Sequence, residues 1–226
     1  MLNTLIDMDE FPKTPPFGER GSRGFQFFVG QGVICHIPLQ GQGITRLKEE
    51  SSPKKDLQER ERREVFMQIA VVYYSHTENT KELAEAVASG VESVDGAKAL
   101  LRDTGTVKKE DFLESSGIIA GSPVYFGLMA ADMKRIFDEF IGIRKKMEGK
   151  VGAAFATSGD ATGGKETTMF SIIQAMLIYG MLISGDPLSA TGHYGTACVG
   201  APDETSRENG AKLGARVAEV AKKLGL

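Results

Sequence analysis

The sequence of 226 residues contains no tryptophan, three histidines and only two cysteines. Cys35 and Cys198 are far apart in the chain, which argues against a disulfide framework or a zinc site and fits a reducing cytosol. No apolar run is long enough to span a bilayer, and the N-terminus has no signal-peptide pattern. We therefore expect a cytoplasmic protein without a metal site and without a membrane partner.

Charge of either sign is not in excess. The chain has 27 lysine and arginine residues against 30 aspartate and glutamate residues, for a formal net charge of −3. Such a balance does not indicate a nucleic-acid surface. The basic residues at 60–63 are interleaved with glutamates, a pattern more typical of a solvated helix. We expect no nucleic-acid partner.

The composition changes near Met67 and divides the chain into two parts. Residues 1–66 hold five of the eight prolines and have no sustained hydrophobic period. We expect this extension to be poorly ordered or to reflect a misassigned start, with translation beginning at Met67; a genuine partner-binding arm is the alternative. Residues 67–226 are numerous enough to bury a core and form the main domain.

Apolar and amphipathic segments alternate along this domain. Strands are expected at 69–74, 97–101, 117–121 and 150–156, with a last strand in two pieces at 181–184 and 195–199. Helices are expected from 79 onward and at 109–114, 129–140, 169–177 and 213–224. This order predicts a parallel sheet covered by helices on both faces. In such sheets, ligands bind beyond the carboxyl ends of the strands.

The loop 75–80 (SHTENT) follows the first strand and leads directly into the first helix. Because it has no glycine, it matches neither the P-loop nor the dinucleotide fingerprint. Its hydroxyls, the Asn79 amide and the N–H groups of a helix start suit one phosphate monoester. The alternative is an ordinary helix start, with Asn79 as the N-cap and Glu82 completing a capping box.

Two further loops, 122–127 and 157–165, follow the third and fourth strands and should meet the first loop at one edge of the sheet. They are rich in glycine and hydroxyl residues and contain no evident catalytic acid, base or metal cluster. Loops of this composition suit a flat ligand that is wrapped by backbone groups. Tyr125 and Phe126 could flank such a ligand, with loop packing as the alternative.

Together the three loops resemble the flavodoxin superfamily, over essentially all of residues 67–226. Loop 75–80 is similar to S-x-T-G-N-T, and 121–127 is similar to G-[ST]-P-x-[YR]-F-G. The resemblance implies an α/β fold, a flavodoxin-like three-layer sandwich with a five-stranded parallel sheet in the order 2-1-3-4-5, and FMN as the cofactor. The implied FMN contacts are Ser75, His76, Thr77, Glu78, Asn79, Thr80, Pro123, Val124, Tyr125, Phe126, Gly127, Thr157, Ser158, Gly159, Gly163 and Gly164.

Within the superfamily, the segment 163–181 and the pair Tyr194-Gly195 are similar to NAD(P)H:quinone oxidoreductases of the WrbA type. This resemblance implies NAD(P)H as electron donor, a quinone-like small molecule as acceptor, and a homo-oligomer as one form of assembly. Ile178 and Tyr179 stand where that group has two histidines, so the flavin site transfers well from the resemblance and the quinone or nicotinamide site does not. A flavodoxin-type electron carrier that docks on a redox partner protein is the alternative, followed by a flavin-free interaction module.

Individual catalytic residues are not evident. His76 and His193 are the only histidines of the domain, and each is either a proton donor near the flavin or an exposed loop residue. Glu78 stands where the superfamily usually has glycine. If that position needs a positive φ, a glutamate there costs about 1 kcal/mol.

Overall fold

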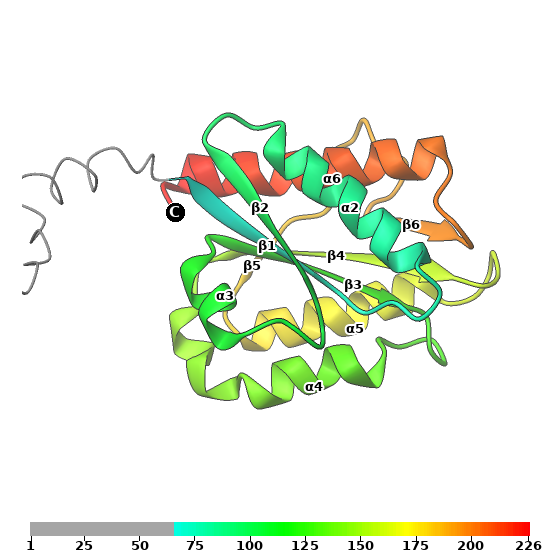
Figure 1. Ribbon diagram of the computed structural model, residues 1–226, viewed down its shortest axis with the longest axis horizontal. Coiled ribbons are helices and arrows are strands. Elements are labelled where there is room, and N and C mark those ends of the chain that lie inside the picture. The colour runs from blue at the N-terminus through cyan, green and yellow to red at the C-terminus, as the bar shows by residue number, and fades with distance from the viewer. Residues whose placement is uncertain (1–65) are drawn as a thin grey trace, which may run out of the picture. The chain divides into compact units, whose positions relative to one another are not determined.

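The computed structural model describes residues 66–226, so the expectations for the extension lie outside the described residues apart from Phe66. The strands are β1 (Met67–Tyr73), β2 (Ala97–Asp103), β3 (Gly117–Pro123), β4 (Val151–Ser158), β5 (Leu182–Ile183) and β6 (Thr196–Val199). The helices are α2 (Asn79–Glu92), α3 (Lys109–Glu114), α4 (Ala131–Glu139), the 3₁₀ helix η1 (Ile141–Lys146), α5 (Lys165–Ile178) and α6 (Glu204–Leu224). Strands and helices alternate from Met67 to α4, after which the 3₁₀ helix η1 and the strand pair β5 and β6 interrupt the pattern (Figure 1).

The strands form one parallel sheet in the order β2-β1-β3-β4-β5. The predicted order is therefore confirmed, and so is the division of the last strand. β5 pairs with the start of β4 at Val151 and Gly152, and β6 pairs with its end, from Phe155 to Ser158. Between the two pieces the chain leaves the sheet edge at 184–195.

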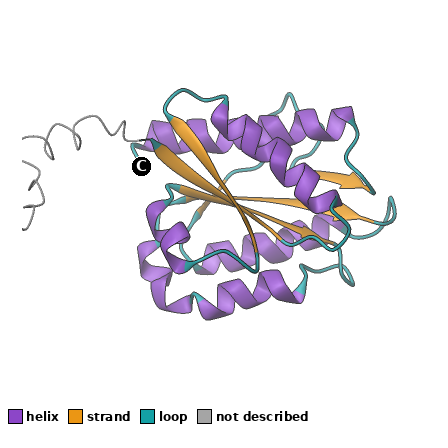
Figure 2. Cartoon of the chain, viewed as in Figure 1, coloured by secondary structure: helices purple, strands orange, loops and turns teal. Residues whose placement is uncertain are grey.

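Helices cover both faces of the sheet, which gives the predicted three layers (Figure 2). Alternate residues of β1 enter different cores: Ile69 and Val71 pack toward α2 and α6, whereas Ala70 and Val72 pack toward α3, α4 and α5. All four are fully buried. Positions that are buried on both faces of a sheet are apolar on either side, which explains the continuous apolar run at 69–72.

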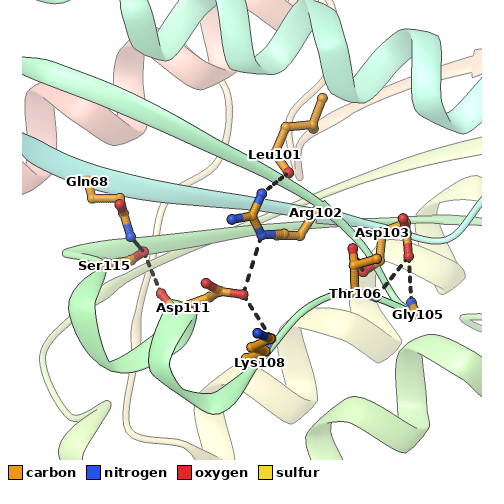
Figure 3. A network of polar contacts seen from close by, with 9 residues as sticks. All are labelled: Gln68, Leu101, Arg102, Asp103, Gly105, Thr106, Lys108, Asp111 and Ser115. Atoms are coloured by element: carbon orange, nitrogen blue, oxygen red, sulfur yellow. Dashed lines mark hydrogen bonds and ion pairs between the residues drawn. The ribbon is translucent and has the colours of Figure 1, made fainter.

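A polar network connects α3 to the strands beside it (Figure 3). Asp111 accepts a hydrogen bond from the Lys108 N–H at 2.8 Å and lies 3.6 Å from the Arg102 Nε. The Ser115 hydroxyl donates to the Asp111 carbonyl at 2.6 Å and accepts from the Gln68 amide of β1 at 3.1 Å. These bonds hold a helix of six residues, which is too short to persist alone in water.

The start of α2 differs from the capping-box interpretation. Glu78, not Asn79, is the N-cap residue, and its side chain makes no capping hydrogen bond. The capping box of Asn79 and Glu82 is therefore wrong, because the left-handed turn at Glu78 already places Asn79 inside the helix. The helix expected from 79 onward is confirmed, and its inner face is apolar, with Leu83 and Val87 fully buried. Among the described helices, none is long and apolar enough to cross a membrane.

Candidate functional site

The carboxyl ends of β1, β3 and β4 hold three loops close together, as expected (Figure 1). The N–H of Tyr74 donates to the carbonyl of Gly121 at 3.1 Å, which joins the first loop to the second. The N–H of Val124 donates to the carbonyl of Thr157 at 2.8 Å, which joins the second loop to the third. The three loops therefore form one continuous rim.

The backbone of the first loop is open. Within the part of the chain that the structure describes, no N–H group of residues 75–80 donates a hydrogen bond. The first helical bond of α2 runs from the Glu82 N–H to the Glu78 carbonyl at 2.9 Å. A loop and first helical turn with unused N–H groups, at the positive end of a helix of 14 residues, form a site for an anion.

Ser75 provides a second sign of a ligand at this loop. Its Oγ atom is buried and has no hydrogen-bond partner among the described residues. A buried hydroxyl that is left unpaired costs about 1–3 kcal/mol, so such atoms are rare unless something else satisfies them. The hydroxyl and the open N–H groups together point to a bound group rich in oxygen acceptors.

Thr80 contributes to the site in a different way. Its hydroxyl lies 2.8 Å from that of Thr157, and both side chains are buried. Thr80 is in the first turn of α2 and Thr157 is near the end of β4, so this bond joins the first loop to the third across one face of the sheet. The hydroxyl of Thr80 is thus already used inside the protein.

Glu78 adopts a left-handed backbone conformation with φ of 66°, so the positive φ considered from the sequence is present. Its carboxylate forms an ion pair of 2.6 Å with the Lys81 ammonium, one helical turn ahead. Lys81 was not recognised from the sequence as part of this site, although the spacing of three residues between opposite charges is a usual signal for such a pair. Glu78 is thus the one carboxylate of loop 75–80, and its partner Lys81 lies just after the loop in the first turn of α2.

The second loop makes a tight turn. The N–H groups of Tyr125 and Leu128 each donate to the other residue's carbonyl at 3.1 Å, and the two residues between them, Phe126 and Gly127, have φ of 53° and 78°. Two positive φ values in succession are typical of a type I′ turn. Phe126 is fully exposed at its tip, whereas the Tyr125 ring meets the Tyr74 ring edge to face at 6.1 Å.

The third loop contacts the second through glycine. Gly164 has φ of 90°, and a Cβ atom there would lie 3.2 Å from the Cα of Gly127. A side chain at Gly164 would press against the backbone of the second loop, so this close approach favours glycine at that position. Ser158 is buried at the start of the third loop and donates to the Asp160 carbonyl at 2.7 Å. A flat group next to these residues would meet mostly backbone.

The two histidines are both exposed, and they lie on different connections. His76 is in the first loop. His193 is on the connection between β5 and β6, where it lines a cavity of about 230 Å³ together with Lys165, Glu166 and Tyr194. Neither position supports a catalytic role, so their interpretation as proton donors stays a prediction.

A comparison with protein families identifies the family of the chain. The model of the NADPH-dependent FMN reductase family matches residues 67–196. The chain belongs to this family. It is thus an FMN-binding oxidoreductase that uses NAD(P)H, and the resemblance noted from the sequence is confirmed.

Several relatives of this FMN reductase family member are similar along nearly their whole length. A flavodoxin of Aquifex aeolicus is 37% identical over 67% of this chain and 85% of its own. An NAD(P)H dehydrogenase (quinone) of Archaeoglobus fulgidus is 36% identical over 69% of this chain and 98% of its own. The crystal structure of a WrbA-like flavodoxin from Agrobacterium tumefaciens matches 70% of this chain and 98% of its own, with a TM-score of 0.60 and 26% identity.

FMN fits the residues at the rim. The reductase offers an open N–H loop and the unpaired Ser75 hydroxyl where a phosphate would be held. Beside it are two glycine-containing loops in mutual contact where a flat ring would meet backbone. Most of the residues expected from the sequence to contact FMN are exposed or half-buried on these three loops. Three of them, Thr80, Thr157 and Ser158, are buried beneath the loops.

Proposed function

We propose that the three-loop rim binds FMN, and that the protein uses it to pass electrons from NAD(P)H to a quinone-like small molecule. The observation that carries the assignment of the site is the first loop. Its N–H groups at 75–80 are open, and the buried Ser75 hydroxyl lacks a partner within the described chain. A phosphate monoester, with its three terminal oxygens, would satisfy both features at once.

The first loop would hold the phosphate through neutral donors. Ser75 and Thr77 supply hydroxyls, and the backbone from 75 to 80 supplies N–H groups next to the positive end of α2. Thr80 would support the site through its bond to Thr157 and would leave its N–H group for the ligand. Neutral donors that are fixed in place before the ligand arrives lose little entropy on binding.

The second and third loops would border the ring system. Val124 is held by its bond to Thr157, and Gly127 and Gly164 touch, so this part of the rim is stiff. Tyr125 is placed by its contact with Tyr74 and is partly exposed. Burial, together with the neighbouring Tyr74, raises the pKa of the Tyr125 hydroxyl, which therefore remains a neutral donor at physiological pH.

When bound, FMN supplies the ability to accept a hydride and to release electrons singly or in pairs. The protein's part is to orient the flavin, to keep water from one side of it, and to leave another side open to donor and acceptor. Exposed apolar side chains at the rim, Phe126 and Leu128, offer a surface for an aromatic acceptor.

The test begins with the full chain incubated with FMN and freed of excess flavin by gel filtration. A retained flavin spectrum is expected, followed by bleaching on anaerobic addition of NADPH or NADH and recovery of the spectrum on addition of a quinone. A colourless protein would contradict the site. Flavin that is retained but not reduced by either nicotinamide would favour an electron carrier that docks on a redox partner protein.

A homo-oligomer stays a prediction for this chain. The described surface has an apolar groove of about 390 Å³ between α4 and α5, lined by residues that include Phe137, Ile141 and Ile178. Light scattering of the purified protein measures the assembly directly. If an oligomer is found, Ile178→Glu separates this groove from other contacts, because a charge there would weaken an interface that covers it.

A further inference from the structure

Glu78 introduces a negative charge into a loop that otherwise offers only neutral donors. It has φ of 66°, a conformation that costs an ordinary side chain about 1 kcal/mol compared with glycine. Its carboxylate is exposed and makes no capping hydrogen bond to α2. The positive end of α2 favours a carboxylate at this position, but neither a capping hydrogen bond nor packing fixes this one there.

Lys81 is the cation that balances this charge. Its Nζ lies 2.6 Å from the Glu78 carboxylate, and the hydrogen bond and charge of Glu78 raise the pKa of Lys81. A lysine in the first turn of a helix is in an unfavourable position with respect to the helix dipole. The ion pair stabilises Lys81 there, and it also keeps the ammonium directed toward Glu78.

We infer that Glu78 and Lys81 together set the affinity for the flavin phosphate, with Glu78 lowering it and Lys81 raising it. The inference rests on the proposed phosphate site. Glu78 repels the phosphate dianion and also engages Lys81, the nearest cation of the loop and first turn. Removing the Glu78 charge ends the repulsion and releases the Lys81 ammonium, whereas removing Lys81 leaves the repulsion unbalanced.

A comparison of FMN with riboflavin distinguishes the contribution of the phosphate to binding from that of the ring, because riboflavin has the same ring and no phosphate. The apoprotein and its variants are titrated with each flavin, and binding is followed by flavin fluorescence. Glu78→Gln removes the charge but keeps a side chain at the left-handed position, so backbone strain is unchanged. Lys81→Met removes the ammonium and keeps the length of the stem.

A matched control is available on α4. Lys134 and Asp138 form an exposed ion pair of 2.6 Å, the same length as the pair of Glu78 and Lys81, and it lies on a helix outside the three loops. Asp138→Asn changes the net charge of the protein as Glu78→Gln does. It should leave the affinity for both flavins unchanged.

Because a single exposed charge of the loop acts on a dianion, Glu78→Gln should lower the dissociation constant for FMN about five- to tenfold and leave that for riboflavin unchanged. Lys81→Met should raise the FMN constant by a similar factor. Both effects should shrink at about 1 M salt, where the Debye length is about 3 Å.

An FMN affinity that is unchanged in Glu78→Gln overturns the inference, and so does an equal gain for FMN and riboflavin, since that would reflect a change of loop shape. In both cases the wild-type protein still binds FMN and the proposed function stands. A wild-type protein that binds neither flavin overturns the proposed function together with this inference.

Discussion

The hydroxyls of Thr80 and Thr157 lie 2.8 Å apart and are shielded from solvent, although the two residues are 77 positions apart in the chain. Thr80 belongs to the first turn of α2, which follows β1, and Thr157 belongs to the end of β4. In the sheet, β3 lies between β1 and β4. The bond thus fixes the first loop relative to the third.

Replacing either threonine by valine should destabilise the protein, because the remaining hydroxyl is then buried without a partner. The expected cost is about 1–3 kcal/mol in the free energy of unfolding for Thr80→Val or for Thr157→Val. The double variant should cost clearly less than the sum, since no unpaired hydroxyl is left. Urea denaturation of the four proteins measures this coupling, and strictly additive losses would show that the bond contributes nothing.

Gly121 and Phe155 are paired across β3 and β4, and the phenyl ring fills the space above the glycine. A Cβ atom on Gly121 would lie 1.9 Å from the Phe155 ring, which is fully buried and cannot move away. Gly121→Ala should therefore cost about 1–3 kcal/mol or more through overpacking. Adding Phe155→Leu should recover part of the loss. If thermal unfolding shows no recovery in the double variant, the contact is not the cause.

The order of strands could be predicted because hydrophobic patterns in the sequence correspond directly to burial in the structure. Fully apolar runs such as Ile118–Ala120 are buried on both faces, and the amphipathic face of α2 with Leu83 and Val87 is buried on one. The clustering of the three loops followed from the topology of a parallel sheet. These inferences need only periodicity and chain order, and the structure confirms them.

Details of the loops could not be predicted, since they depend on contacts between distant residues. Asn79 looked like an N-cap because of its residue type, but the path from β1 places Glu78 in the left-handed conformation and makes it the N-cap. The Thr80 to Thr157 bond joins residues on elements that no local pattern relates. The turn at Phe126 and Gly127 needs two positive φ values, and only its glycine was a visible signal.

Tyr179 should make the stability of the protein sensitive to alkaline pH. Its hydroxyl donates to the Phe137 carbonyl of α4, and burial, assisted by the Asp138 carboxylate, raises the pKa of Tyr179 to about 12. A raised pKa in the folded state means that the stabilisation is complete below pH 10 and is lost as the pH rises toward 12. Tyr179→Phe should cost about 1–2 kcal/mol at pH 8.

The difference between the wild type and Tyr179→Phe should shrink by about 1 kcal/mol between pH 8 and pH 11, because only the wild type has this proton to lose. Denaturant unfolding at several pH values in this range provides the measurement. A difference that stays constant with pH would mean that the tyrosine hydroxyl titrates alike in both states.

The Cys198 thiol should react slowly with thiol reagents in the folded protein. Burial, with a smaller contribution from Asp203, raises the pKa of Cys198 to about 11 from 9.0. Because the thiolate is the reactive form, this shift lowers the reactive fraction near pH 8 about a hundredfold, before any steric protection. A Cys35→Ser variant isolates the signal in a reaction with a chromogenic disulfide. Modification at the same rate with and without denaturant would contradict the burial of this residue.

Ser75→Ala should separate binding from stability. The Ser75 Oγ has no partner among the described residues, so its removal takes away an unpaired polar atom, and the apoprotein should be as stable as the wild type or slightly more so. A hydrogen bond to a charged group contributes about 1.5–3 kcal/mol, so the FMN dissociation constant should rise about ten- to hundredfold, while riboflavin binding stays unchanged.

Ser93→Ala at the other end of α2 is the control for this prediction. Because the Ser93 hydroxyl donates to the Gly90 carbonyl at 2.6 Å, this variant should show the opposite pattern of lower stability and normal FMN affinity. If Ser75→Ala destabilises the apoprotein and binds FMN normally, this hydroxyl serves the fold, and the phosphate site has to be sought elsewhere on the rim.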